Sequence, residues 1–108
     1  MNLGDPSLNV LTPSCPKKSG TCECTDANAD PSKYSDTYKR WLLMNAEAQM
    51  TSFEIGWGWF YWTWVTESSV QWSWKLGMAA GILPQKTWNR DFNCTQAVPD
   101  FAGLPENY

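Results

Sequence analysis

The segment from Trp57 to Val65 constrains the fold of this chain more than any other stretch. It holds four tryptophans, one phenylalanine and one tyrosine, and the first charged residue after it is Glu67. Side chains of a β-strand alternate between two faces, so a strand with one wetted face shows a polar residue at every second position. Here both alternating sets are almost entirely apolar. One set is Trp57, Trp59, Tyr61, Thr63 and Val65, and the other is Gly58, Phe60, Trp62 and Trp64.

This two-sided pattern predicts a strand at 57–65 that is covered on both faces, as in a parallel sheet with helices outside. A chain of 108 residues has little other sequence with which to cover such a strand. A fold of this size also buries only roughly two-thirds of its unfolded surface. We therefore expect the chain to be part of a larger protein.

Composition and charge exclude several classes of function. Eight tryptophans are many for this length, and we expect most of these rings to lie in the core; the alternative is an exposed stacking platform. The formal charge of −3 and the lack of a basic stripe argue against nucleic acid as a partner. The sequence contains no histidine, which excludes Ser-His-Asp and Cys-His catalysis and any histidine-ligated metal. No stretch is long enough to span a membrane.

The cysteines favour disulfide bonds over a metal site. A Cys-x-Cys pair with a distant fourth cysteine matches no common zinc spacing, whereas an even count in loop-like sequence is typical of disulfides and of an oxidising compartment. Four cysteines allow three pairings, and the spacing leaves all three open. The cysteines are Cys15, Cys22, Cys24 and Cys94.

Asn93-Cys94-Thr95 is the one glycosylation acceptor pattern in the sequence, with Asn93 as the acceptor. It fits secretion, although nothing near Met1 resembles a signal peptide. Secretory chemistry without a secretory signal is a second reason to expect an N-terminal part beyond this chain.

The rest of the chain is organised around the predicted strand. Ser35 is placed to cap a helix over 36–54, in which apolar residues recur at helical spacing. A second helix is predicted over 70–80, with Gly81 as its C-terminal cap. Helix, buried strand and helix in this order are typical of a parallel α/β fold. The predicted organisation is a loop with the cysteines at 1–34, a helix–strand–helix unit at 35–84 and an irregular C-terminal tail at 85–108.

Six motifs follow one another along the chain: Tyr34-Ser35-Asp36, Glu47-Ala48-Gln49, Phe53-Glu54, the run from Gly56 to Glu67, Gln71-Trp72 and Gly81-Ile82-Leu83-Pro84. In content and order they resemble the C-terminal end of the fungal exo-β-1,3-glucanases of glycoside hydrolase family 5. The resemblance covers about residues 14–94, and the tail from Val98 resembles a subset of these enzymes. Several ordered matches make the resemblance specific.

The resemblance implies a (β/α)8 TIM barrel of about 250 residues or more. This chain would be its seventh helix, eighth strand, eighth helix and tail, preceded by the disulfide-bearing loop. In a barrel the last inward residue of a strand lies at the C-terminal mouth, where active sites are built. Trp64 is therefore the predicted sugar-stacking ring, with Trp62 one layer deeper; the alternative is that both only fill the barrel. The family often has lysine at Val65 and Glu-Asn-Ala-Pro-Glu-Trp at 67–72, so polar contacts at the mouth are not carried over.

The resemblance also implies where the catalytic groups lie. Retaining glycosidases need two carboxyl groups about 5 Å apart, and the resembled family takes them from segments after its fourth and seventh strands that this chain does not contain. Glu106 stands in the order Pro-Glu-Asn, the reverse of the family motif, and is not carried over. We expect Glu47 and Glu54 to be solvated helix charges. Glu67 follows the strand at the active-site end and is predicted to contact substrate or to hold its loop by hydrogen bonds.

We therefore expect the C-terminal portion of a retaining exo-β-1,3-glucanase acting on fungal cell-wall β-1,3-glucan. It would supply aromatic substrate-binding residues but neither catalytic glutamate, need no metal or cofactor, and hydrolyse nothing by itself. The alternatives are a non-catalytic secreted carbohydrate-binding or interaction protein derived from such an enzyme, and a truncated product without function. Expected partners are β-1,3-glucan or its oligosaccharides and the remainder of the barrel, in an extracellular or cell-wall location. The resemblance implies a bridge between Cys15, or a neighbouring cysteine, and Cys94.

Overall fold

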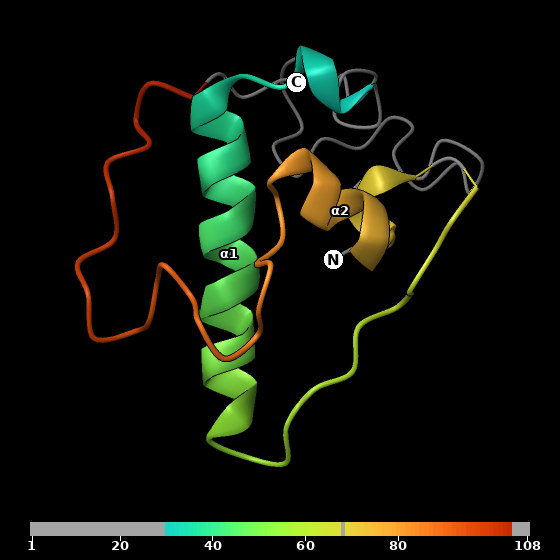
Figure 1. The fold of residues 1–108 in the computed structure, drawn as a ribbon. Coiled ribbons are helices and arrows are strands. Elements are labelled where there is room, and N and C mark those ends of the chain that lie inside the picture. The colour runs from blue at the N-terminus through green and yellow to red at the C-terminus, as the bar shows by residue number, and fades with distance from the viewer. Residues whose placement is uncertain (1–29, 68, 105–108) are drawn as a thin grey trace, which may run out of the picture.

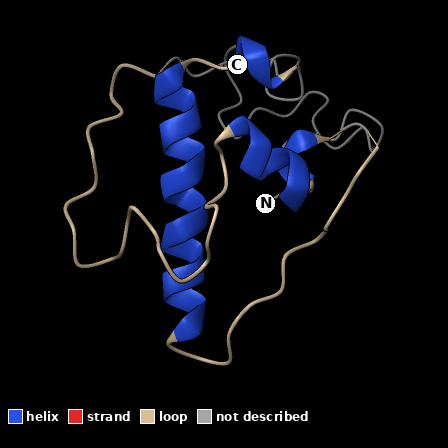
Figure 2. Cartoon of the chain, in the orientation of Figure 1, coloured by secondary structure: helices blue, strands red, loops and turns tan. Residues whose placement is uncertain are grey.

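The computed structural model describes residues 30–67 and 69–104 (Figure 1). Two α-helices dominate this part, a long α1 at Asp36–Glu54 and a short α2 at Trp74–Ala80. Two 3₁₀ helices precede them, η3 at Pro31–Lys33 and η4 at Val70–Trp72. Figure 2 shows helices and loops but no strand within these residues.

The first helix has the bounds that the sequence predicted. The Ser35 side chain accepts a hydrogen bond from Tyr38 N at 3.1 Å, and Asp36 lies in the first turn. The cap satisfies one of the free N–H groups of the helix start, and the acidic residue suits the positive end of the helix dipole. Tyr38, Leu42 and Met50 are buried along one side of α1, as the helical spacing of apolar residues predicted.

The second helix begins later than expected. Val70–Trp72 form the separate 3₁₀ helix η4, and α2 begins at Trp74 because the buried Ser73 has extended backbone and caps the helix through Leu76 N at 3.2 Å. Gly81 ends α2 with φ of 75°, a left-handed conformation that favours glycine. The predicted C-terminal cap is confirmed, whereas the predicted start at residue 70 is wrong.

The strand expected at 57–65 is absent from the described part of the chain. These residues form an extended connection that leaves the end of α1 and returns to η4 and α2 (Figure 1). The physical reason is that a strand needs a neighbouring strand to accept its backbone hydrogen bonds, and the described residues supply none. Residues 57–65, called the aromatic segment below, are held instead by individual hydrogen bonds and ring contacts with the end of α1, with η4 and with α2.

The core lies where α1 faces η4, α2 and the residues that follow α2. Gly77 allows a close approach in it, because a Cβ atom at this position would lie 2.6 Å from Leu83 Cδ1. Tyr34 and Tyr38 meet edge to face, with ring centroids 5.1 Å apart, a favoured geometry for aromatic pairs. The core residues are Tyr34, Tyr38, Leu42, Val70, Ile82 and Leu83.

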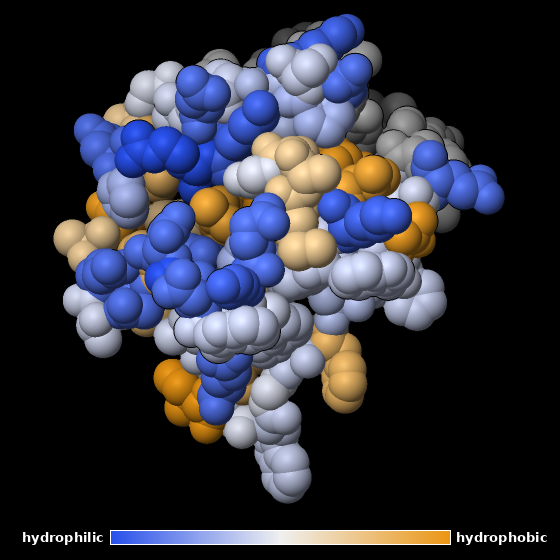
Figure 3. Space-filling model, viewed as in Figure 1, coloured by the Kyte–Doolittle hydropathy of each residue, from blue (hydrophilic) through white to orange (hydrophobic). Residues whose placement is uncertain are grey.

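The expectation that most tryptophans lie in the core is wrong. All eight are in the described part, and none is fully buried. The core described above is too small to enclose rings of this size, and no second layer of described residues covers the aromatic segment. Figure 3 shows side chains projecting from the end of the molecule where α1 passes into this segment. The most exposed tryptophans are Trp57, Trp62, Trp64 and Trp88.

Residues 85–104 consist of turns and irregular backbone, without a helix or strand. They cross α1 and continue along the side of α1 away from the aromatic segment (Figure 1). Phe92 is the one large side chain of this stretch that is buried. Within the described ranges, neither helix has the length and apolar character needed to cross a membrane.

Candidate functional site

The aromatic segment keeps the alternation of a strand even though it pairs with no strand. Trp59 and Tyr61 are half-buried against α2: Trp59 stacks on Trp74 with centroids 5.9 Å apart, and Tyr61 meets the same ring edge-on at 5.1 Å. Phe60, Trp62 and Trp64, which alternate with Trp59, Tyr61 and Thr63, are exposed. From residue 59 to residue 64 the period of two thus separates half-buried from exposed side chains, whereas Trp57 and Val65, at the two ends of the segment, are both exposed. The open face of the segment consists of Phe60, Trp62 and Trp64, at 104%, 78% and 63% exposure.

The C-terminal half of the aromatic segment is tied to the start of α2 through its backbone. Thr63 donates to Trp72 O at 2.6 Å and accepts from Trp74 N at 2.8 Å. The Trp64 carbonyl accepts from Lys75 N at 3.1 Å. These bonds fix the backbone of Trp64 while its ring stays exposed, so the ring is presented from an anchored position.

Tyr61 anchors the middle of the segment. Its hydroxyl donates to the Gln71 carbonyl oxygen, and burial raises the pKa of Tyr61 to about 12. The phenol is therefore neutral at physiological pH, as a hydrogen-bond donor in a half-buried place must be.

A groove of about 490 Å³ lies between α1 and the aromatic segment. Its size falls within the range of small-molecule sites. Rings and carboxamides line it, and among the described residues that border it there is no charged side chain. The side chains that set its chemistry are Trp41, Asn45, Gln49, Trp62, Gln71 and Trp72.

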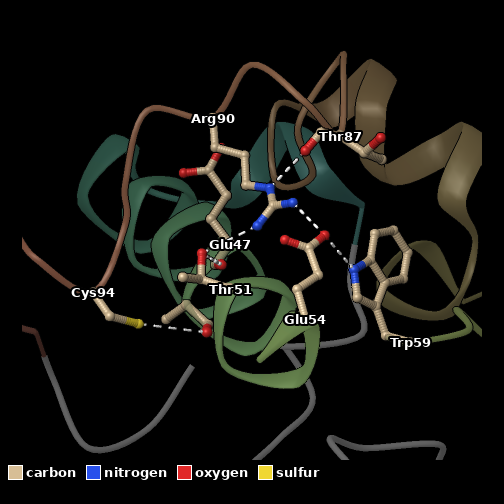
Figure 4. Close-up of polar contacts among 8 residues, drawn as sticks. Glu47, Thr51, Glu54, Trp59, Thr87, Arg90 and Cys94 are labelled. Carbon is tan, nitrogen blue, oxygen red and sulfur yellow. Dashed lines mark hydrogen bonds and ion pairs between the residues drawn. The ribbon is translucent and has the colours of Figure 1, made fainter. Parts of the chain in front are cut away.

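A polar cluster joins the end of α1 to the aromatic segment and to residues 87–90 (Figure 4). The Glu54 Oε1 atom accepts from Arg90 Nη2 and from Trp59 Nε1, the latter at 2.9 Å. Arg90 also donates to Thr51 Oγ1 at 3.1 Å and to the Thr87 carbonyl at 2.6 Å. The hydrogen bond from Arg90, followed by that from Trp59, holds the pKa of Glu54 below its ordinary value. Glu54 thereby connects three segments that are separate in sequence.

Glu47 has surroundings that the sequence did not predict. It is only 1% exposed, and its two carboxylate oxygens accept from Asp91 N at 3.1 Å and from Phe92 N at 2.8 Å. The expectation of a solvated helix charge is therefore wrong for Glu47. A signal was present in the sequence, because no basic residue stands three or four positions from Glu47 to pair with it across helical turns.

The predicted substrate-binding residues lie in different surroundings. Trp62 and Trp64 are both exposed, and of the two only Trp62 also borders the groove. Glu67 is exposed, and no hydrogen bond or ion pair joins it to another residue of the described ranges. Its role as a substrate contact stays a prediction.

The cysteines are only partly within the described structure. Cys94 is exposed, its Sγ atom lies 3.8 Å from the Ala48 carbonyl oxygen, and it forms no disulfide with any described residue. Cys15, Cys22 and Cys24 lie outside the described residues, so the pairing stays a prediction. Asn93 is exposed beside Cys94. No group of metal-ligating side chains is present in residues 30–67 and 69–104.

Comparison with known proteins identifies close relatives over nearly the whole chain. It is 57% identical over 104 residues to "Probable glucan 1,3-beta-glucosidase D" from Aspergillus terreus, which covers 94% of this chain and 12% of the relative. It is 57% identical over 88 residues to "Glucan 1,3-beta-glucosidase D" from Emericella nidulans, covering 82% of the chain and 11% of that protein. The Aspergillus niger relative is 50% identical over 103 residues, with 94% and 12% covered.

The chain is homologous to part of fungal glucan 1,3-beta-glucosidase D. It spans only about 12% of the length of these relatives. The resemblance to a fungal β-1,3-glucanase is confirmed at this level. No protein-family model and no solved structure matches the chain. The open face of the aromatic segment is the candidate functional site of this chain, which is related to one part of the glucosidase.

Proposed function

We propose that this chain acts as the C-terminal, carbohydrate-binding end of a retaining family 5 exo-β-1,3-glucanase. In this proposal residues 57–65 form the eighth strand of a (β/α)8 barrel once neighbouring strands are present, with α1 and α2 as the seventh and eighth helices. The substrate is β-1,3-glucan of the fungal cell wall. The catalytic glutamates and the other strands come from sequence outside these 108 residues.

The open face of the aromatic segment carries the proposal. A barrel strand packs one face on the outer helices and turns the other inward. The packing of Trp59 and Tyr61 on α2, with Phe60, Trp62 and Trp64 exposed, supports such a division in the middle of the segment. Homology to part of a protein named as a glucan 1,3-β-glucosidase supports glucan as the ligand.

Trp64 takes the leading role in binding. Its backbone is fixed by the bond from Lys75 N, while its ring is 63% exposed, so an indole face is available to the C–H face of a glucose unit. Trp62, next on the same face, extends the apolar surface. Glu67 follows at the same end and would accept hydrogen bonds from sugar hydroxyl groups.

The two glutamates of α1 already have hydrogen-bond partners, which supports a binding role of this chain rather than a catalytic one. Glu47 is occupied by two backbone N–H groups, and Glu54 by Arg90 and Trp59. Neither is available as a nucleophile or as a proton donor to a glycosidic oxygen. The disulfides and the extracellular or cell-wall location belong to the same proposal.

Binding of laminari-oligosaccharides to the 108-residue chain tests the proposal, with the change in tryptophan fluorescence as the readout. We expect Trp64→Ala to weaken binding about tenfold, which corresponds to about 1.4 kcal/mol. Trp57→Ala is the matched control, because it removes the same type of side chain from a fully exposed position that belongs to the other alternating set. Equal affinity in both variants would refute the assignment of Trp64.

Hydrolysis of laminarin tests the missing catalytic groups. We expect no glucose release from the chain alone and release when the remainder of a relative is supplied as a second polypeptide. Glucose release by the chain alone would contradict the proposal. Binding without release, even with the remainder present, would favour the non-catalytic carbohydrate-binding protein.

A further inference from the structure

The turn at residues 93–96 contains a motif that glucan binding does not use. Asn93-Cys94-Thr95 is the one Asn-x-Ser/Thr pattern in the chain, and residues 93–96 are all exposed. The turn begins directly after Phe92, whose backbone N–H is bound by the buried Glu47. The acceptor pattern therefore starts at a point that is fixed to α1 and continues out into solvent.

The side chains of the pattern are arranged around the Asn93 carboxamide. Asn93 Oδ1 accepts from Thr95 N at 3.0 Å and from the Thr95 hydroxyl. The turn closes with Asn93 N donating to Gln96 Oε1 at 2.9 Å and Gln96 N donating to Asn93 O at 3.0 Å. Within the described residues, no acceptor is bound by Asn93 Nδ2, which is the atom that a glycosylation reaction uses.

Cys94, the middle residue of the pattern, makes a contact of its own with α1. Its Sγ atom is directed at the Ala48 carbonyl of α1, 3.8 Å away (Figure 4). The thiol and the Asn93 carboxamide therefore have different partners, Ala48 of α1 and Thr95 of the turn.

We propose that Asn93 is an N-glycosylation site. Asn93 Nδ2 forms a bond to the anomeric carbon of an oligosaccharide carried on a lipid diphosphate. The bond from that carbon to the diphosphate oxygen breaks, the lipid diphosphate leaves with the electron pair, and the proton of Nδ2 passes to a base of the transferase. The modification requires entry into the secretory pathway and is independent of the proposed glucan binding.

The position of the glycan leaves the open face uncovered. Beyond Arg90 the chain follows the side of α1 away from the aromatic segment (Figure 1). The backbone that carries the acceptor pattern therefore lies on the other side of α1 from residues 57–65. A glycan attached there adds hydrophilic surface without blocking the rings that the proposed function needs.

Translation of the full 108-residue chain behind a cleavable secretory signal, with endoplasmic-reticulum membranes that contain the transferase and its lipid-linked donor, tests the site. We expect one added glycan, removed by peptide N-glycosidase with conversion of Asn93 to aspartate in the peptide mass spectrum. Asn93→Gln and Thr95→Ala should abolish the added mass. Thr95→Ser and Cys94→Ser, which keep the pattern, should retain it.

The readout depends on covalent mass and not on folding, so a misfolded variant remains informative. An unmodified wild-type chain, in membranes that modify a control acceptor, would overturn the proposal. Added glycan that persists in Asn93→Gln would overturn it as well. Glucan binding by the unmodified chain has no bearing on this result, so the two proposals fail separately.

Discussion

Glu47 places a carboxylate where only 1% of the residue is exposed, and it compensates for this burial with two backbone N–H donors from residues 91 and 92. Removal of the carboxylate leaves those donors without an acceptor, at about 1–3 kcal/mol for a buried group. We expect Glu47→Ala to lower the free energy of unfolding by about 3 kcal/mol in urea denaturation. The exposed Glu67→Ala should change it by less than about 0.5 kcal/mol. Similar losses in the two variants would show that the Glu47 bonds do not stabilise the fold.

Glu54 makes the contact between α1, Arg90 and Trp59 dependent on pH. The Arg90 hydrogen bond, with a smaller effect of Trp59, lowers the pKa of Glu54 from 4.5. Because the folded-state pKa is lower than the unfolded one, the stability from this contact is complete above pH 4.5 and is lost as pH falls through the folded pKa. The NMR signal of the Trp59 indole N–H should shift in this acid range. Arg90→Gln should move that shift to higher pH; an unchanged midpoint would contradict the assignment to Arg90.

At the level of the elements, α2 and the aromatic segment depend on one buried hydroxyl. Ser73 is 0% exposed, accepts from Leu76 N at 3.2 Å as the α2 cap, and donates to the Trp64 carbonyl at 3.4 Å. Loss of a cap costs about 1 kcal/mol, and Ser73→Ala also frees the Trp64 carbonyl. In thermal unfolding we expect Ser73→Ala to lower the melting temperature more than Ser35→Ala does. Ser35 is exposed, and its side chain only caps α1. Equal losses would mean that the contact with Trp64 contributes nothing.

Local signals made the helices predictable, and missing partners made the strand unpredictable. Ser35 and Gly81 act within one helical turn, so their effects on α1 and α2 could be inferred from neighbouring residues alone. The period of two in the aromatic segment could also be recognised from the sequence, and it matches the alternation of exposure from residue 59 to residue 64 but not the exposed Trp57 and Val65. Whether such a segment becomes a strand depends on strands elsewhere. The lack of a basic neighbour on α1 could indicate that Glu47 is not paired on the helix surface, but its partners lie 44 and 45 residues away in sequence and could not be identified from local pattern.

For the molecule as a whole, the open face predicts association. Each indole presents roughly 150–250 Å², which at about 25 cal/mol per Å² is roughly 4–6 kcal/mol when fully covered. Burial of Trp62 and Trp64 together would therefore contribute a free energy of about 8.2 kcal/mol or more, which is the binding free energy of a complex with a micromolar Kd. The cost of association is still to be subtracted from this value. Unpartnered apolar surface of this kind normally marks an interface.

We expect the isolated chain to self-associate with rising concentration in sedimentation velocity, since the open face can be covered by a second copy when no barrel strands are present. The double variant Phe60→Ser, Trp62→Ser should shift the distribution towards monomer. Trp88→Ser is the control, because Trp88 is 81% exposed but lies outside the aromatic segment. Addition of the remainder of a relative should also dissolve the oligomers, because its strands would cover the same rings. A wild-type chain that stays monomeric well above micromolar concentration would mean that these rings are stable in water, and the need for covering strands would lose its physical basis.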